Sequence, residues 1–180
     1  KTATNPAARI WDAIALFAYD APEASLQIQA STINAIERKL IDGSLHIGII
    51  PAHRSSESLE YDSLFDETML LYCGDRHPLF GVEDGALDRA IVNQHKFAGL
   101  GYHSPNMEVS ERAGLRRAAT GLDQEAIATL VLSGRFLGFL PDHYAEPFVS
   151  AGRMRPLRPD LFQYTCDFVS VVRRSPKPAR

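Results

Sequence analysis

Residues 36–53, IERKLIDGSLHIGIIPAH, combine a helix and a strand in the order that decides the fold. Apolar residues first recur at helical spacing, and Gly43 then supplies a residue suited to the left-handed conformation that ends helices. Residues 45–50 form an apolar run too short for a helix and bounded by Gly43 and Pro51. This run predicts a buried strand, so the stretch is one helix followed by one strand.

The same order recurs later in the chain. Residues 126–132 predict a helix, Ser133 and Gly134 its end, and residues 136–140 a strand. Each of the two strands is followed by Pro-x-His, and the carboxyl ends of strands are where open α/β sheets bind ligands. Further strands are expected at residues 25–30, 64–73, 96–101 and 163–172, with helices between them and a first helix that begins at Asn5-Pro6. Strands separated by helices predict parallel βαβ units, and therefore an α/β fold of two small lobes.

Composition limits the class of protein. The 180 residues are 45% hydrophobic, enough for real cores, and carry a formal net charge of -3, so no basic field is present to hold a nucleic acid. No apolar run is long enough to span a bilayer. Cys73 and Cys166 cannot form a disulfide framework and both lie in apolar runs. We therefore expect a cytoplasmic protein, and the first residue, Lys1, suggests a fragment of a longer chain.

Several blocks in order resemble the effector-binding domain of LysR-type transcriptional regulators. Residues 40–49, LIDGSLHIGI, resemble the entry into the family's first central strand. Residues 77–80, HPLF, are similar to its HPL turn, and residues 130–141, LVLSGRFLGFLP, to its late glycine-containing block. His46 stands where the family usually has an acidic residue, and Phe136 replaces the second glycine of the late block. The blocks cover nearly the whole chain.

The resemblance implies two Rossmann-like lobes joined by crossing strands, as in type 2 periplasmic binding proteins. We expect residues 1–73 to form the first part of lobe I, 74–144 lobe II, and 145–180 the return to lobe I. A small, anionic effector would bind between the lobes and alter DNA binding by the full-length protein. The winged helix-turn-helix that contacts promoter DNA is expected to be absent from this chain, and family members form dimers or tetramers.

The candidate effector contacts are chosen on two grounds, the family resemblance and the physical properties of helix ends. Backbone N–H groups at helix amino ends favour anions, and hydroxyls there can bond a ligand oxygen, although helix capping alone also accounts for such residues. In the second lobe, a loop leaving a buried strand would supply further contacts, including an aromatic ring. The candidates are Thr2, Thr4, Asn5, Ser31 and Thr32 in the first lobe and Gly101, Tyr102, His103 and Phe136 in the second.

Three other functions are considered. No histidine pair has the spacing of a zinc site, and convergence of His53, His103 and His143 would depend on tertiary structure, so no metal or other cofactor is expected. Cys73 is the one imaginable nucleophile of an enzyme, but it ends an apolar strand, where thiols are inert. An extracytoplasmic solute-binding protein would share the lobes but would need an export signal.

Overall fold

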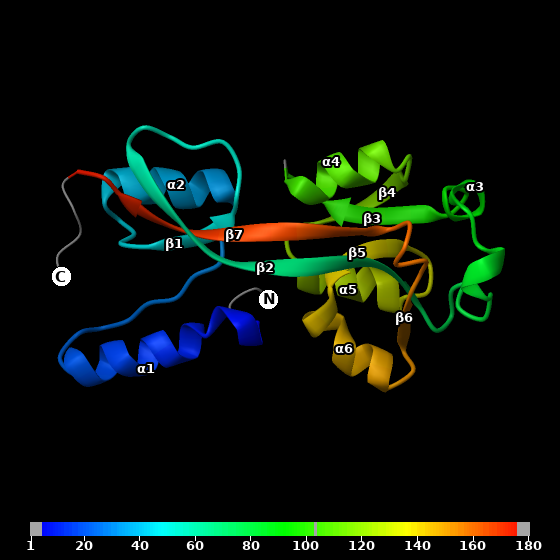
Figure 1. Ribbon diagram of the computed structural model, residues 1–180, viewed down its shortest axis with the longest axis horizontal. Coiled ribbons are helices and arrows are strands. Elements are labelled where there is room, and N and C mark those ends of the chain that lie inside the picture. Colours follow the sequence, from blue (N-terminus) through cyan, green and yellow to red (C-terminus); the bar gives the residue numbers. More distant parts are fainter. Residues whose placement is uncertain (1–4, 103, 176–180) are drawn as a thin grey trace. The chain divides into compact units, whose positions relative to one another are not determined.

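A computed structural model describes residues 5–102 and 104–175, and Figure 1 shows its helices and strands. The chain divides into two compact units, Lys1–Asp66 with Asp167–Arg180, and Glu67–Cys166. Strands β2 (Leu59–Gly74) and β7 (Gln163–Arg173) each run from one unit into the other. The fold is therefore a mixed α/β fold of two units joined by two strands.

The boundaries expected from the sequence lay at 73/74 and 144/145, whereas the compact units divide the chain at 66/67 and 166/167. The end of β2 lies in the second unit because its residues 69–72 pair with β5 (Leu137–Pro141) and residues 72–74 with β6 (Met154–Pro156). Helix α6 (Asp142–Ser150) also stays with this unit, because it packs on β5 and β6.

The first unit contains the helix and strand predicted from residues 36–53. Helix α2 (Ile33–Asp42) ends at Gly43, whose φ of 82° is left-handed, and strand β1 (Gly48–Pro51) pairs antiparallel with β7. A Cβ on Gly48 would lie 2.6 Å from Cγ2 of Ile36, so the missing side chain lets α2 approach β1 closely. The buried core of this unit consists of Ile33, Leu40, Ile50, Leu59 and Val171.

The beginning of this unit differs from the prediction. Asn5 caps a short 3₁₀ helix (Pro6–Ala8), and Arg9, with a φ of 48°, separates it from helix α1 (Ile10–Asp20), which buries none of its residues. The strand expected at residues 25–30 is wrong, since these residues form no strand and Ile28 is 69% exposed. The alternation of apolar and polar residues at 25–30 is not enough to form a strand, because a strand needs a neighbour to pair its backbone groups.

The second unit is built on strands in the order β2-β5-β3-β4, with β6 paired to β2. Strand β3 (Lys96–Leu100) lies parallel to β5 on one side and to β4 (Arg116–Gly121) on the other. Helices α5 (Gln124–Leu132) and α6 cover one face of this sheet, and α4 (Pro105–Arg112) packs against β3 on the other (Figure 1). A short helix, α3 (Arg89–Val92), and a 3₁₀ turn (Asp84–Ala86) precede β3.

Close packing of α5 fixes the core of this unit. A Cβ on Gly138 would lie 2.7 Å from Cγ2 of Ile127 and 2.8 Å from Cγ2 of Val131, so glycine is what allows the helix to rest on β5. The second predicted helix-strand pair is confirmed, with Gly134 (φ 72°) between α5 and β5. The buried cluster consists of Tyr72, Ala98, Leu100, Ile127, Ala128, Val131, Leu140, Ala145 and Met154.

A turn after β2 contains a buried histidine. His77 is 4% exposed, and its Nδ1 accepts a hydrogen bond from the backbone N–H of Leu79 at 3.2 Å, which fixes the turn. The His95 ring lies 4.8 Å away, centroid to centroid. Burial, together with His95, lowers the pKa of His77 to about 4. The imidazole is therefore neutral at physiological pH, with its proton on Nε2.

We predict that Gly134→Ala destabilises the protein much more than Gly152→Ala. Both glycines have positive φ, which costs an alanine about 1–2 kcal/mol. A Cβ at Gly134 would also meet Cβ of Arg76 at 2.5 Å, whereas nothing lies within 4 Å of one at Gly152. Urea denaturation should give a loss of about 1 kcal/mol for Gly152→Ala and about 3 kcal/mol for Gly134→Ala. Equal losses would contradict the close approach to Arg76.

We also predict that His77 makes the protein less stable in acid. Between pH 6.5 and about 4 the unfolded chain binds a proton at this residue and the folded chain does not, so the free energy of unfolding falls as pH falls. The loss attributable to His77 should reach about 2–3 kcal/mol. His77→Asn keeps an acceptor for the Leu79 N–H but removes the titration, so its stability should depend less on pH. The exposed His46→Asn is the control, and an unchanged pH dependence in His77→Asn would refute the assignment.

Candidate functional site

The carboxyl ends of three parallel strands meet at one edge of the second unit. Strands β3, β4 and β5 end at Leu100, Gly121 and Pro141. Gly101, directly after β3, donates its N–H to the carbonyl of Gly121 at 2.9 Å. Tyr102 follows, half-buried against the core cluster, and burial raises its pKa. This edge therefore places the predicted contacts Gly101 and Tyr102 where α/β sheets bind ligands.

Ser104, which is not among the contacts predicted from the sequence, lies at the amino end of α4. It occupies the N-cap position but makes no side-chain cap hydrogen bond, and its Oγ is buried without a partner among the described residues. Next to it, Asn106 accepts a hydrogen bond from the Leu100 N–H at 3.3 Å and donates one to the Tyr164 hydroxyl at 3.4 Å. Ser104-Pro105 is a recognisable helix start, so the sequence did carry a signal for this hydroxyl.

An acid-histidine pair lies at the same edge. Glu67 is 3% exposed, and its strand pairs with β5 so that Met69 stands opposite Pro141, which brings Glu67 to the carboxyl end of β5. His143, in the first turn of α6, places Nε2 3.8 Å from Oε1 of Glu67. This Nε2 is buried and makes no hydrogen bond to the described residues. The sequence offered only a weak signal for Glu67, a single carboxylate within an apolar strand.

The first unit carries polar side chains at the start of α2 and along it. Thr32 is the N-cap residue of α2 but makes no side-chain cap hydrogen bond, so capping does not account for its hydroxyl. The Tyr61 hydroxyl donates to Oε1 of Glu37 at 2.7 Å, and His53 Nε2 lies 3.2 Å from the same oxygen. Burial and the hydrogen bond to Glu37 raise the pKa of Tyr61. Ser31 is exposed.

The remaining predicted contacts are placed elsewhere. Asn5 is buried and its side chain accepts a hydrogen bond from the Ala7 N–H at 2.9 Å, which is a capping role. Phe136 precedes β5, about 16 Å along the strands from the edge that carries Tyr102, so it does not join that group. The candidates Thr2, Thr4 and His103 lie outside the described residues.

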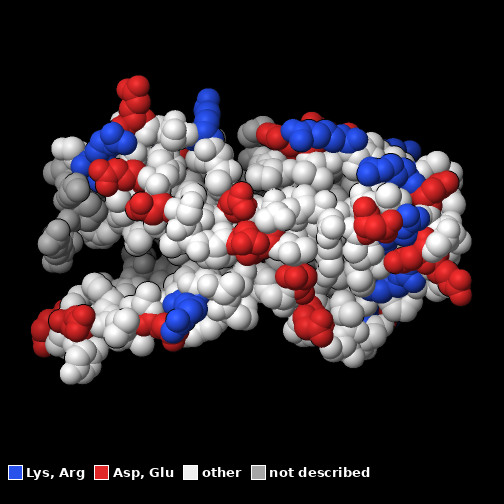
Figure 2. Space-filling view, in the orientation of Figure 1, with Lys and Arg blue, Asp and Glu red and all other residues white. Residues whose placement is uncertain are grey.

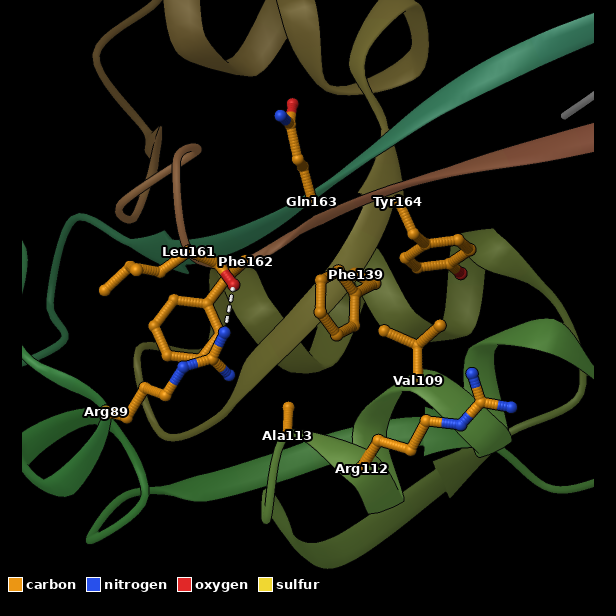
Figure 3. A pocket seen from close by; sticks show the side chains of 9 residues that line it. All are labelled: Arg89, Val109, Arg112, Ala113, Phe139, Leu161, Phe162, Gln163 and Tyr164. Atoms are coloured by element: carbon orange, nitrogen blue, oxygen red, sulfur yellow. Dashed lines mark hydrogen bonds between the residues drawn. The ribbon is translucent and has the colours of Figure 1, made fainter.

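At least two cavities are lined by described residues of the second unit. The smaller, of about 300 Å³, is shown in Figure 3. Both of its arginines are engaged, since Arg89 donates to the carbonyl of Leu161 at 3.1 Å and lies over the Phe162 ring, and Arg112 pairs with Glu108 at 3.2 Å. The larger, of about 520 Å³, lies at the amino ends of the strands. It is lined by His77, Pro78, Gln94, His95, Lys96, Arg116, Gly134, Arg135 and Phe136.

The chemistry of Cys73 and of the histidines sets limits on other functions. Cys73 is fully buried, and burial raises the pKa of its thiol to about 12, so it is an inert thiol at physiological pH. Across residues 5–102 and 104–175, no three histidine, cysteine or acidic side chains gather as metal ligands would. None of the helices in the same ranges combines the length and hydropathy needed to cross a bilayer.

Comparisons with known proteins identify the family of this chain. Residues 2–180 match the model of the LysR substrate binding domain. A curated relative, the HTH-type transcriptional activator BauR of Pseudomonas aeruginosa, is 35% identical over 175 residues. The match covers 97% of this chain but only 57% of that protein.

Solved structures share the fold. The CcmR regulatory domain of Synechocystis, determined in complex with 2-PG, is 15% identical with a TM-score of 0.75, and the match covers 94% of this chain and 84% of that one. The C-terminal domain of a probable LysR family regulator from Rhodococcus is 20% identical with a TM-score of 0.69, covering 94% and 85%. The domains of this family are regulatory and not enzymatic. The hypothesis of an enzyme that uses Cys73 as its nucleophile is therefore excluded. This chain belongs to the LysR substrate-binding domain family, the regulatory domains of LysR-type transcriptional regulators.

Proposed function

We propose that this chain binds a small anionic effector at the strand-end edge of its second unit, and that binding changes DNA recognition by the full-length regulator. The observation that carries the proposal is the buried hydroxyl of Ser104, which no described residue satisfies although it stands at the amino end of α4. A buried hydroxyl without a partner costs free energy, and a ligand oxygen would restore the bond.

The electrostatics of this position favour an anion. Pro105 has no N–H and the Met107 N–H bonds the Ser104 carbonyl, so α4 offers the Asn106 N–H together with the helix dipole. The dipole is worth about 0.3–1 kcal/mol toward an anion at an exposed site and more at a buried one. Tyr102 adds a half-buried ring on which an aromatic or planar effector could stack. The CcmR regulatory domain, which shares the fold, holds the small molecule 2-PG, which supports a ligand-binding role for the fold.

In the first unit, the hydroxyl of Thr32 is a second proposed contact, because it stands at the amino end of α2 and makes no cap bond. Ser31 is adjacent and exposed. The chain spans 57% of the length of the curated relative, so the part of a regulator that contacts promoter DNA would lie outside it. Self-association into dimers or tetramers belongs to the same proposal.

We predict that Ser104→Ala weakens effector binding at least tenfold. A hydrogen bond from a neutral donor to a charged ligand contributes about 1.5–3 kcal/mol, and 1.4 kcal/mol is a factor of ten. A thermal-shift screen of small carboxylates and phosphate esters identifies the effector, and calorimetry then compares the variant with the native chain and with Ser63→Ala. Ser63 is exposed in β2 and serves as the matched control. Equal affinities in all three proteins would remove Ser104 from the site.

We predict that Thr32→Val lowers effector affinity and leaves the melting temperature of the free protein within about 2 °C. Because the hydroxyl makes no hydrogen bond to the described residues, its loss costs the fold little. Calorimetry with the effector from the screen measures the affinity. An unchanged affinity would show that Thr32 does not contact the effector.

A further inference from the structure

The larger cavity of the second unit gathers three cationic side chains. Lys96 begins β3, Arg116 begins β4, and Arg135 stands two residues before β5. Because these strands are parallel neighbours in the order β5-β3-β4, their first residues lie side by side at the amino edge of the sheet. All three line one hollow of about 520 Å³.

These three cations have no carboxylate partner in the described part of the chain. The ion pairs of the second unit involve other basic residues, among them Arg112 with Glu108, Arg117 with Glu111 and Arg153 with Asp75. In the smaller cavity both arginines are likewise engaged. The larger cavity therefore brings three cations together without a carboxylate partner among the described residues.

The register places two of these like charges side by side. Lys96 stands directly opposite Arg116 in the β3-β4 ladder. Like charges at directly opposed positions destabilise a sheet, and an anion between them would reverse the sign of the interaction. The chain as a whole has a net charge of -3, so this local excess of positive charge is not a consequence of composition.

The remaining lining supplies hydrogen-bond donors and an apolar wall. His77 is buried with Nδ1 already accepting a bond from Leu79, which leaves Nε2–H as a donor with no partner among the described residues. His95 packs against it, and Pro78 and Phe136 provide apolar surface. This lining suits an oxyanion, because it offers cations and a neutral imidazole donor and has little competing negative charge.

We propose that this cavity is a second ligand site, separate from the effector site, which binds a small oxyanion carrying two or more negative charges. Lys96, Arg116 and Arg135 provide the charge, and His77 donates a hydrogen bond from Nε2. The site lies at the opposite end of the strands from Tyr102 and Ser104, about 16 Å away along the sheet. It does not depend on the proposed function, because it uses none of the same residues.

The test uses calorimetry with pyrophosphate and with citrate, which separate phosphoryl from carboxyl sources, in 150 mM KCl so that weak surface attraction is screened. The native chain is expected to bind at least one of them. The triple variant Lys96→Gln/Arg116→Gln/Arg135→Gln, whose side chains are exposed, should weaken binding at least 30-fold. A control that removes three charges elsewhere, Arg38→Gln/Arg54→Gln/Arg112→Gln, should change it less than threefold.

Two further measurements locate the site. Ligand should shift the ring proton NMR signals of His77 and His95, and Ser104→Ala should bind pyrophosphate or citrate as the native chain does. The proposal is overturned if neither anion binds, if the control variant loses as much affinity as the triple variant, or if Ser104→Ala abolishes binding. It is also overturned if the triple variant binds both anions as tightly as the native chain does.

Discussion

Parallel pairing of β3 with both β4 and β5 is the constraint on which the second unit depends. Parallel neighbours need crossover connections, and here α4 and α5 provide them. All three strands therefore begin at one edge of the sheet and end at the other. The carboxyl edge carries Gly101, Tyr102 and Ser104, and the amino edge carries Lys96, Arg116 and Arg135. One pairing pattern thus separates two surfaces with different chemistry.

The charges on the surface and the charges in the larger cavity are arranged differently. On the face shown in Figure 2, acidic and basic side chains lie among one another without a continuous basic area. This agrees with the net charge of -3 and gives no support for direct nucleic-acid binding by the described residues. Three cations without a carboxylate partner instead line one cavity, beside the buried His77.

The local sequence pattern was sufficient to predict those helices and strands whose burial is decided within a few residues. The helix that ends at Gly43, the strand β1 and the α5-β5 pair with Gly134 between them were all predicted, because apolar period and left-handed glycines are local signals. Residues 25–30 alternate just as a strand does, yet they have no pairing neighbour, and pairing is a property of the whole chain. The order of blocks predicted the family, which no single motif could have done.

The candidate site was only partly predictable for the same reason. Gly101 and Tyr102 follow a strand that the sequence marks clearly, so their edge was known in advance. Phe136 was predicted as an effector contact from its place in the late block, although a residue just before a parallel strand lies at the amino edge. Ser104-Pro105 marks a helix start, but the sequence does not show that the serine hydroxyl is buried without a partner. The Glu67-His143 pair depends on which strands become neighbours, and no spacing in the sequence reveals that adjacency.

The contact of α5 with Gly138 has a consequence for how such domains can diversify. Any side chain at Gly138 would displace the helix from β5, so this position tolerates almost no change. Gly101, by contrast, is exposed, with no atom closer than 3.5 Å to a Cβ built there. On the proposal that the effector binds at the carboxyl edge, a library of variants that randomises the loop after β3 and preserves Gly138 would alter ligand preference on an intact scaffold, and the loop would be a starting point for building new sensors.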